Sequence, residues 1–312
     1  MKLVTVQPKA GGTARFGFID ENSVFVLQEY ASAAEYLKHL PASQKHVHEI
    51  FLSGKGKNGI SLSEVRFLAP VPHPPMLLDF SLAPSHLEKA LDTLLKREYN
   101  PFMSWIMKKM FRSSSKRKKA MGMLDYYKAN HLAVSGDGDE VFWPDYTAFL
   151  DYECELGVVI GTREQPIAGY LILNDWSARD VQMPEMFSLS LTRSKDFAKS
   201  YGLGPWLVTP DEIPDPLNLK ARVIVPGKFD FEGSTSGYSI HPRQTIEYLR
   251  TMFDPAPGTV FGMGTIPNLC GLEHDLWISP GDEVQLSIEG LGTLRQYAPR
   301  KNIGNAVSRW KK

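Results

Sequence analysis

The chain has 312 residues, with 43% hydrophobic and 22% charged side chains, and its 35 basic residues balance its 35 acidic residues. A net charge of zero argues against bulk electrostatic binding to nucleic acid or to an anionic membrane. Cys154 and Cys270 are too few for a disulfide scaffold, and no apolar run is long enough to span a membrane. We therefore expect a cytoplasmic protein without a signal peptide that binds neither nucleic acid nor a membrane.

The first 70 residues predict a small α+β domain. Short alternating apolar runs at 3–6 and 24–27 are typical of strands, and a helical stretch follows near 33–52. The proline-rich passage at 69–75 stiffens the backbone and predicts a boundary. The predicted domains are therefore residues 1–70 and residues 71–312.

Residues 80–125 predict helices that form a lid or insertion in the second domain. Seven cations lie between Lys108 and Lys119, interrupted by the serines at 113–115. This block could bind anions or nucleic acid, or it could be a mobile, solvated insertion. The serine run and the lack of interleaved aromatic residues favour the solvated insertion.

From about residue 130 the chain is rich in strand signals separated by turn residues such as Glu289-Gly290. The clearest strands are expected at 155–160, 170–173, 221–225, 283–288 and 291–297. Long helices are few in this part. The predicted fold class is mostly β with α.

The segment 151–161 combines carboxylates with a Val/Ile-rich strand. Side chains alternate along a strand, so Glu153 and Glu155 should share a face. On a buried face the two carboxylates would repel each other strongly unless a cation lay between them. On this segment alone, a divalent metal site and a solvated outer face are equally plausible.

A second segment runs from an apolar strand at 171–173 into Asp175 and then into a helix. Ser177 and Asp180 have the spacing of a capping pair, and Arg179 and Gln182 should share a helical face. Each residue taken alone fits an ordinary helix start. Together they indicate a site at the end of a strand.

A third segment holds Asp79 and His86. A lone histidine is more often structural than catalytic, and the remaining histidines show no spacing typical of a metal site. No cysteine and histidine pattern along the sequence supports zinc.

Taken together, these motifs resemble the fumarylacetoacetate hydrolase family over roughly residues 70–300. The stretch Asn174-Asp175-Trp176-Ser177-Ala178-Arg179-Asp180 is the most specific of them. The supporting motifs are Glu153-x-Glu155, Ser194-Lys195-Asp196-Phe197, Leu203-Gly204-Pro205-Trp206, Gly264-Thr265 and Cys270-Gly271-Leu272-Glu273. The resemblance implies a rolled β-sheet core and a homodimer.

The resemblance also implies a role for each matching residue. Asp79, Glu153, Glu155 and Asp175 would bind a divalent cation, and Arg179, Gln182 and Thr265 would hold the substrate. The catalytic residues would be His86, Glu273 and Lys195. His86 would activate water, and Glu273 would orient the His86 side chain. Oxygen ligands of this kind suit Mg²⁺ or Mn²⁺, with Ca²⁺ as a third candidate.

The implied function is a metal-dependent hydrolase that cleaves a C–C bond in a β-diketone or acylpyruvate-type 2-oxo acid, a substrate that could chelate the metal. The chain departs from the family pattern at Ser81, where the hydrolases carry tyrosine, and at Glu88, which is only two residues after His86. These departures leave open a hydratase, isomerase or decarboxylase, or a catalytically silent protein that binds a metal or metabolite.

Overall fold

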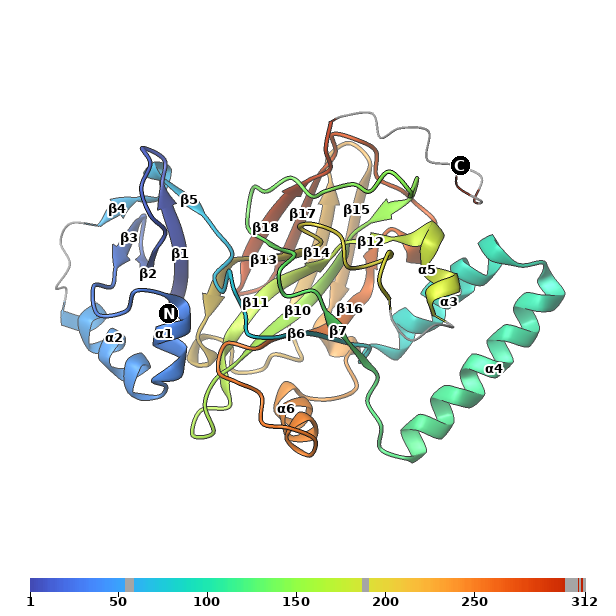
Figure 1. Cartoon of the computed structure of the whole chain (residues 1–312), viewed down its shortest axis with the longest axis horizontal. Helices are drawn as coiled ribbons and strands as arrows, with labels where there is room; N and C mark the ends of the chain where they lie inside the picture. The colour runs from blue at the N-terminus through green and yellow to red at the C-terminus, as the bar shows by residue number, and fades with distance from the viewer. Residues whose placement is uncertain (54–58, 187–190, 301–307, 309, 311–312) are drawn as a thin grey trace.

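The computed structural model describes residues 1–53, 59–186, 191–300, 308 and 310. Its largest element is a 12-stranded sheet, whose main path runs β4-β3-β2-β1-β13-β11-β10-β16-β6-β7 (Figure 1). Strand β5 pairs with β1, and β8 pairs with β13 in parallel. The predicted sheet-dominated fold with several helices is confirmed.

The N-terminal strands form one end of this sheet. They are β1 (Lys2–Pro8), β2 (Arg15–Asp20), β3 (Ser23–Val26), β4 (Ile60–Ser61) and β5 (Val65–Phe67). Strand β1 pairs with β13 (Tyr201–Val208) through Lys2 opposite Val208, so the N-terminal strands continue the central sheet. The domain boundary near residue 70 stays a prediction.

The helical stretch expected near 33–52 is two helices, α1 (Ala33–Lys38) and α2 (Ala42–Ser53). Pro41 lies between them. Proline lacks a backbone N–H and cannot continue a helix, which accounts for the break. Pattern alone correctly indicated the helical region but missed this interruption.

The centre of the sheet is built from strands that are buried on both faces. They are β6 (Leu77–Phe80), β10 (Glu153–Ile160), β11 (Ile167–Asp175), β13 and β16 (Val260–Cys270), with β7 (Tyr126–Ala129) at the edge. All eight residues of β10 and all nine of β11 are buried. Strand β6 runs parallel to β16, with Asp79 opposite Gly262, and this pairing brings Asp79 close to β10.

A second sheet of four strands, β15-β14-β17-β18, packs against the first around a shared apolar core. Its strands are β14 (Lys220–Val225), β15 (Phe229–Ser234), β17 (Glu283–Ile288) and β18 (Gly292–Tyr297). The hairpin between β17 and β18 turns at Glu289-Gly290, as predicted, with Gly290 at a φ of 77°. Glycine adopts this left-handed conformation without the steric cost that other residues meet.

Shorter elements connect the sheets. They are β8 (Val134–Ser135), β9 (Leu150–Asp151), β12 (Ser177–Ala178), α5 (Arg179–Glu185), α6 (Pro242–Arg250) and the 3₁₀ helices η1 (Leu62–Glu64), η2 (Pro210–Glu212), η3 (Thr235–Gly237) and η4 (Leu272–His274). Strands β9 and β12 pair with each other. The predicted capping pair is wrong, because Ser177 lies in β12 and its hydroxyl donates to Asp175 O, while Asp180 accepts from Thr147 and Ala148.

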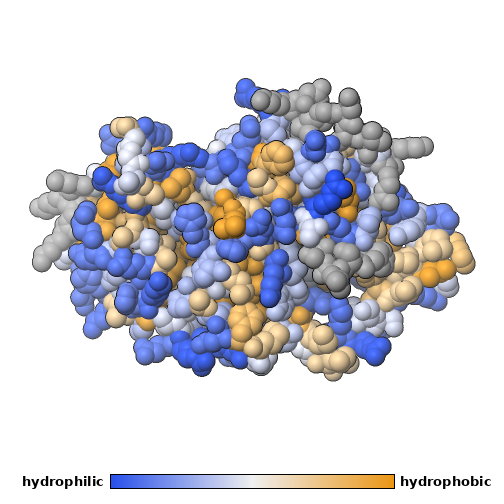
Figure 2. All heavy atoms as spheres, in the orientation of Figure 1, coloured by the Kyte–Doolittle hydropathy of each residue, from blue (hydrophilic) through white to orange (hydrophobic). Residues whose placement is uncertain are grey.

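The predicted helical region 80–125 contains two long helices, α3 (Pro84–Glu98) and α4 (Pro101–Ala120). Asn100 separates them and caps α4, accepting a 2.9 Å hydrogen bond from Met103 N. None of the residues in α4 is buried, and it lies at the opposite end of the molecule from the N-terminal strands (Figure 1). Hydrophobic surface gathers at that end, over side chains that include Phe102, Trp105 and Met110 (Figure 2).

The described residues contain no helix that is both long enough and apolar enough to cross a membrane. Helix α4 is long enough, but it contains the basic block. That block is part of a regular helix in the structure, and none of its residues is buried.

Candidate active site

Three carboxylates from three strands meet in the middle of the sheet. Asp79 comes from β6, Glu155 from β10, and Asp175 is the last residue of β11. One oxygen from each lies within 4.8 Å of the other two, and all three residues are buried. We call this set the carboxylate trio. The expectation that widely separated acidic residues converge is confirmed for these three.

The trio has the features of a cation site. Asp79 Oδ1, Glu155 Oε1 and Asp175 Oδ1 are buried and have no hydrogen-bond partner among the described residues. Burial, added to repulsion from neighbouring carboxylates, raises the pKa of all three groups. Buried oxygens without a partner are costly, and a hard divalent cation would satisfy them. The residues present therefore fit a divalent cation.

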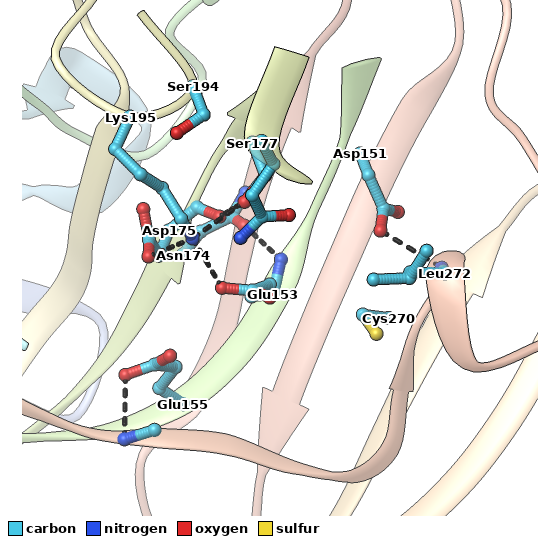
Figure 3. Close-up of polar contacts among 12 residues, drawn as sticks. Asp151, Glu153, Glu155, Asn174, Asp175, Ser177, Ser194, Lys195, Cys270 and Leu272 are labelled. Atoms are coloured by element: carbon cyan, nitrogen blue, oxygen red, sulfur yellow. Dashed lines mark hydrogen bonds and ion pairs between the residues drawn. The ribbon is translucent and has the colours of Figure 1, made fainter. Parts of the chain in front are cut away.

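Glu153 lies on the same strand but has different partners. Its two oxygens accept 2.7 Å hydrogen bonds, Oε1 from Arg179 and Oε2 from Lys195. Figure 3 shows the contact with Lys195. Burial acts to raise the pKa of Glu153, but Arg179, Lys195 and His86 outweigh it and lower that pKa well below its usual range. Glu153 is therefore ionised and already neutralised by cations, and its role as a metal ligand stays a prediction.

Lys195 connects Glu153 to the trio. Its ammonium group also donates to Asp175 Oδ2 and, over 2.7 Å, to the Ser177 hydroxyl (Figure 3). Burial lowers the pKa of Lys195, but the charges of Asp175 and Glu153 outweigh this and raise it. The lysine is therefore a permanent cation at the border of the trio.

Arg179 is almost completely buried and is held by three partners. Its Nε donates over 2.9 Å to Asp151 Oδ2, and its Nη1 donates over 3.0 Å to Gln182 Oε1, in addition to the contact with Glu153. Asp151 also accepts hydrogen bonds from the backbone N–H groups of Gly271 and Leu272. The predicted helical face of Arg179 and Gln182 is thus confirmed, and Asp151 fixes the position of the guanidinium group.

The predicted catalytic histidine lies between Glu153 and Glu273. His86 is on α3, with Nε2 3.9 Å from Glu153 Oε1 and Nδ1 3.4 Å from Glu273 Oε2. Thr265 is buried on β16, directly opposite Glu155 in the sheet. All ten predicted site residues therefore lie in one connected region, although their individual roles stay predictions.

Sequence reasoning missed several residues of this region. Asp151 has the same two-residue spacing from Glu153 as Glu153 has from Glu155, and that spacing could have identified it. Tyr127 donates a 2.6 Å hydrogen bond to Asp175 Oδ2, but its place beside a basic helical segment carries no such signal. Gly262 leaves the space for the trio, since a Cβ there would lie 2.2 Å from Glu155 Oε2.

The chain matches known proteins in sequence and in fold. The family model described as fumarylacetoacetate (FAA) hydrolase C-terminal matches residues 107–297. A relative named 2,4-didehydro-3-deoxy-L-rhamnonate hydrolase, from Sphingomonas sp. (strain SKA58), is 32% identical over 187 residues, which is 56% of this chain and 65% of that protein. The chain thus spans less than two thirds of the length of the curated relatives it matches.

Solved structures show the same fold. A fumarylacetoacetate hydrolase from Exiguobacterium antarcticum aligns with a TM-score of 0.68 and 22% identity over 96% of this chain and all of that one. A 2-hydroxyhepta-2,4-diene-1,7-dioate isomerase from Mycobacterium marinum aligns with a TM-score of 0.66 and 22% identity, covering 97% and 99% of the two chains. At this identity the likeness establishes the fold alone.

Proposed function

Because the chain belongs to the fumarylacetoacetate hydrolase family, which has hydrolase and isomerase members, we propose that it is a metal-dependent hydrolase that cleaves a C–C bond. The proposed substrate is a β-diketone or acylpyruvate-type 2-oxo acid. The observation that carries this proposal is the buried carboxylate trio, which has three oxygens without a hydrogen-bond partner among the described residues and contacts Lys195. Lys195 in turn shares Glu153 with Arg179.

Asp79, Glu155 and Asp175 would hold the cation, with Glu153 as the fourth proposed ligand, and the all-oxygen set suits Mg²⁺ or Mn²⁺, with Ca²⁺ as a third candidate. When bound, the cation supplies Lewis acidity that stabilises negative charge on substrate oxygens. The cation would offset two of the three negative charges of the ionised trio, and the Lys195 ammonium, which is shared with Glu153, lies against the third. An anionic substrate would bind to the cation and to these basic side chains.

Lys195 and Arg179 would bind and orient the substrate oxygens. The three contacts of the Lys195 ammonium go to two carboxylates and to the Ser177 hydroxyl. Ser177 is the only neutral acceptor of the three, so a substrate oxygen carrying negative charge would replace it at the lowest cost. Gln182 and Thr265 would supply further polar contacts at the same place.

His86 would take a proton from water on its Nε2 atom. This nitrogen lies 3.9 Å from Glu153 Oε1, whereas Nδ1 lies 3.4 Å from Glu273 Oε2. A proton on Nδ1 directed toward the carboxylate of Glu273 would leave Nε2 free as the base and stabilise the imidazolium that forms. The resulting hydroxide would attack the acyl carbonyl carbon, and the electrons of the broken C–C bond would move onto the departing 2-oxo acid as its enolate. The imidazolium of His86 would then return its proton to the enolate carbon, which completes the 2-oxo acid and restores the base.

The test is the loss of ultraviolet absorbance of a simple acylpyruvate with Mg²⁺, and again with excess chelator. We expect turnover only with the metal. His86→Ala should lower kcat by about 10²–10⁴-fold while Mg²⁺ still binds, because general-base catalysis contributes that much. His274→Ala is the matched control, since His274 contacts Asn268 O and the ring of Phe231 instead.

A fully active His86→Ala enzyme would contradict the hydrolytic mechanism. The alternative is then a hydratase, isomerase or decarboxylase of a 2-oxo acid on the same site. Mg²⁺ binding without turnover of any 2-oxo acid would instead favour a catalytically silent member.

We also propose that the protein acts in the cytoplasm as a homodimer on this small molecule, without nucleic acid or membrane partners. The two free, buried cysteines support a reducing compartment. The dimer rests on the family resemblance.

A further inference from the structure

We propose a second metal site, formed by His86, Cys270 and Glu273, that binds a thiophilic cation such as Zn²⁺. The three residues come from α3, the end of β16 and η4. One ligand atom from each lies within 4.8 Å of the other two. The pattern is invisible along the sequence because His86 is far from the other two residues.

The distances match a tetrahedral zinc site. Zn–N and Zn–O bonds of about 2.0–2.1 Å and Zn–S bonds of about 2.3 Å place tetrahedral ligand atoms about 3.3–3.6 Å apart. In the structure, Glu273 Oε2 lies 3.4 Å from His86 Nδ1 and 3.6 Å from Cys270 Sγ. Two of the three edges therefore already have the length that a bound zinc requires.

The atoms around this position are buried and incompletely satisfied. His86 is 7% exposed, and the side chain of Glu273 is fully buried. Among the described residues, neither His86 Nδ1 nor Glu273 Oε1 has a hydrogen-bond partner. Unpaired buried nitrogen and oxygen atoms are unfavourable, and a cation coordinated at this position would remove part of that cost.

The ligand set distinguishes this site from the carboxylate trio. A thiolate and an imidazole favour zinc and related transition metals, whereas carboxylates alone favour Mg²⁺ and Mn²⁺. Burial, Asp151 and Glu273 raise the pKa of the Cys270 thiol, so the thiol is protonated without metal. Metal binding would release that proton to the solvent and leave a thiolate and a carboxylate to balance the two charges of zinc.

This site would inhibit the enzyme, a consequence that rests on the proposed role of His86 as the base. Zinc on Nδ1 would leave the ring proton on Nε2, and a protonated Nε2 cannot take a proton from water. Zinc would also link α3 to η4 and to the end of β16, because it would bind His86 on α3, Glu273 on η4 and Cys270 on β16. Zinc would therefore slow hydrolysis without displacing Mg²⁺ from the trio.

The experiment uses Co²⁺ as a spectroscopic substitute for Zn²⁺, added to the full chain saturated with Mg²⁺. We expect one equivalent of Co²⁺ to produce a thiolate-to-cobalt charge-transfer band in the near ultraviolet, which carboxylate ligands cannot produce, and Zn²⁺ to abolish it. Cys270→Ala and His86→Ala should each remove the band or weaken Co²⁺ binding at least tenfold. Cys154→Ala is the matched control, because Cys154 is the other buried free cysteine and should leave the band intact.

No band in the wild-type protein, or a band that persists in Cys270→Ala, would overturn the proposed site. Inhibition is measured separately, as the Zn²⁺ concentration that halves the rate of each protein with Mg²⁺. This concentration should be at least tenfold higher for Cys270→Ala than for the wild type. A protein that shows the band but no turnover of any acylpyruvate would support the zinc site while contradicting the proposed hydrolase. Turnover without a band would do the reverse.

Discussion

Glu153 and Glu155 lie two residues apart on β10 and face the same side of the sheet, yet their surroundings are opposite. Glu153 is bound by Arg179 and Lys195, and its pKa is lowered. Glu155 faces Asp79 and Asp175, and burial together with these carboxylates raises its pKa. One half of the site has its charges paired by the protein, and the other half has an excess of negative charge.

This difference in charge pairing distinguishes the residues that stabilise the site from the residues that can bind a cation. In the paired half, Asp151 and Glu153 carry two negative charges against the two positive charges of Arg179 and Lys195. In the other half, one cation among the described residues, Lys195, contacts the three carboxylates, and it does so through Asp175. A buried charge that is already paired contributes to the fold, whereas an unpaired carboxylate takes up a proton or a cation from solution.

Glu153→Gln tests the paired half and should have the largest effect on stability. The glutamine amide N–H₂ would face a buried cation, so either Arg179 or Lys195 would lose its partner. We expect the free energy of unfolding of the metal-free protein to fall by about 3–5 kcal/mol, which denaturant titration with chelator would measure. The control is Arg163→Met, which removes the exposed ion pair with Asp254 and should change stability much less. A loss for Glu153→Gln no greater than that of the control would contradict the comparison.

Glu155→Gln tests the other half and should have the opposite sign in the metal-free protein. Removing one of three mutually repelling carboxylates should leave the metal-free protein at least as stable as the wild type. Mg²⁺ at about 100 times its Kd should stabilise the wild type by about 2.7 kcal/mol, and the variant should lose most of that gain. Thermal unfolding with and without Mg²⁺ measures both effects, and an unchanged Mg²⁺ effect in Glu155→Gln would remove Glu155 from the cation site.

Local pattern predicted much of the fold but not this division. The alternation of β10 showed that Glu153 and Glu155 share a face, and the Gly290 turn marked the hairpin of β17 and β18. These signals depend on neighbours in the sequence. Whether each glutamate is paired with a cation depends on Arg179, Lys195 and Asp79, which lie on other elements. The spacing of the two glutamates therefore could not distinguish the paired one from the unpaired one.

The trio itself was expected only from the family resemblance. Asp79 reaches Glu155 because β6 runs parallel to β16, a long-range pairing that no local pattern reveals. The predicted Ser177 cap failed for a related reason, since pairing of β12 with β9 delays the start of the helix. Tertiary contacts decided both outcomes.

Gly262→Ala should sharpen the comparison with a smaller effect that is confined to the trio. A Cβ at this position would lie 2.2 Å from Glu155 Oε2 and 2.8 Å from Asp79 Oδ1, so the two carboxylates would have to move. We expect Mg²⁺ affinity to fall about 10–100-fold, as for other changes to residues that position metal ligands, and calorimetric titration would measure it. Gly157→Ala is the matched control, because Gly157 is opposite Gly262 in the sheet and its added Cβ would meet the Leu171 side chain instead. Both variants should lose stability through overpacking, but only Gly262→Ala should weaken Mg²⁺ binding, and equal Mg²⁺ affinity in the two would show that the trio does not hold the cation.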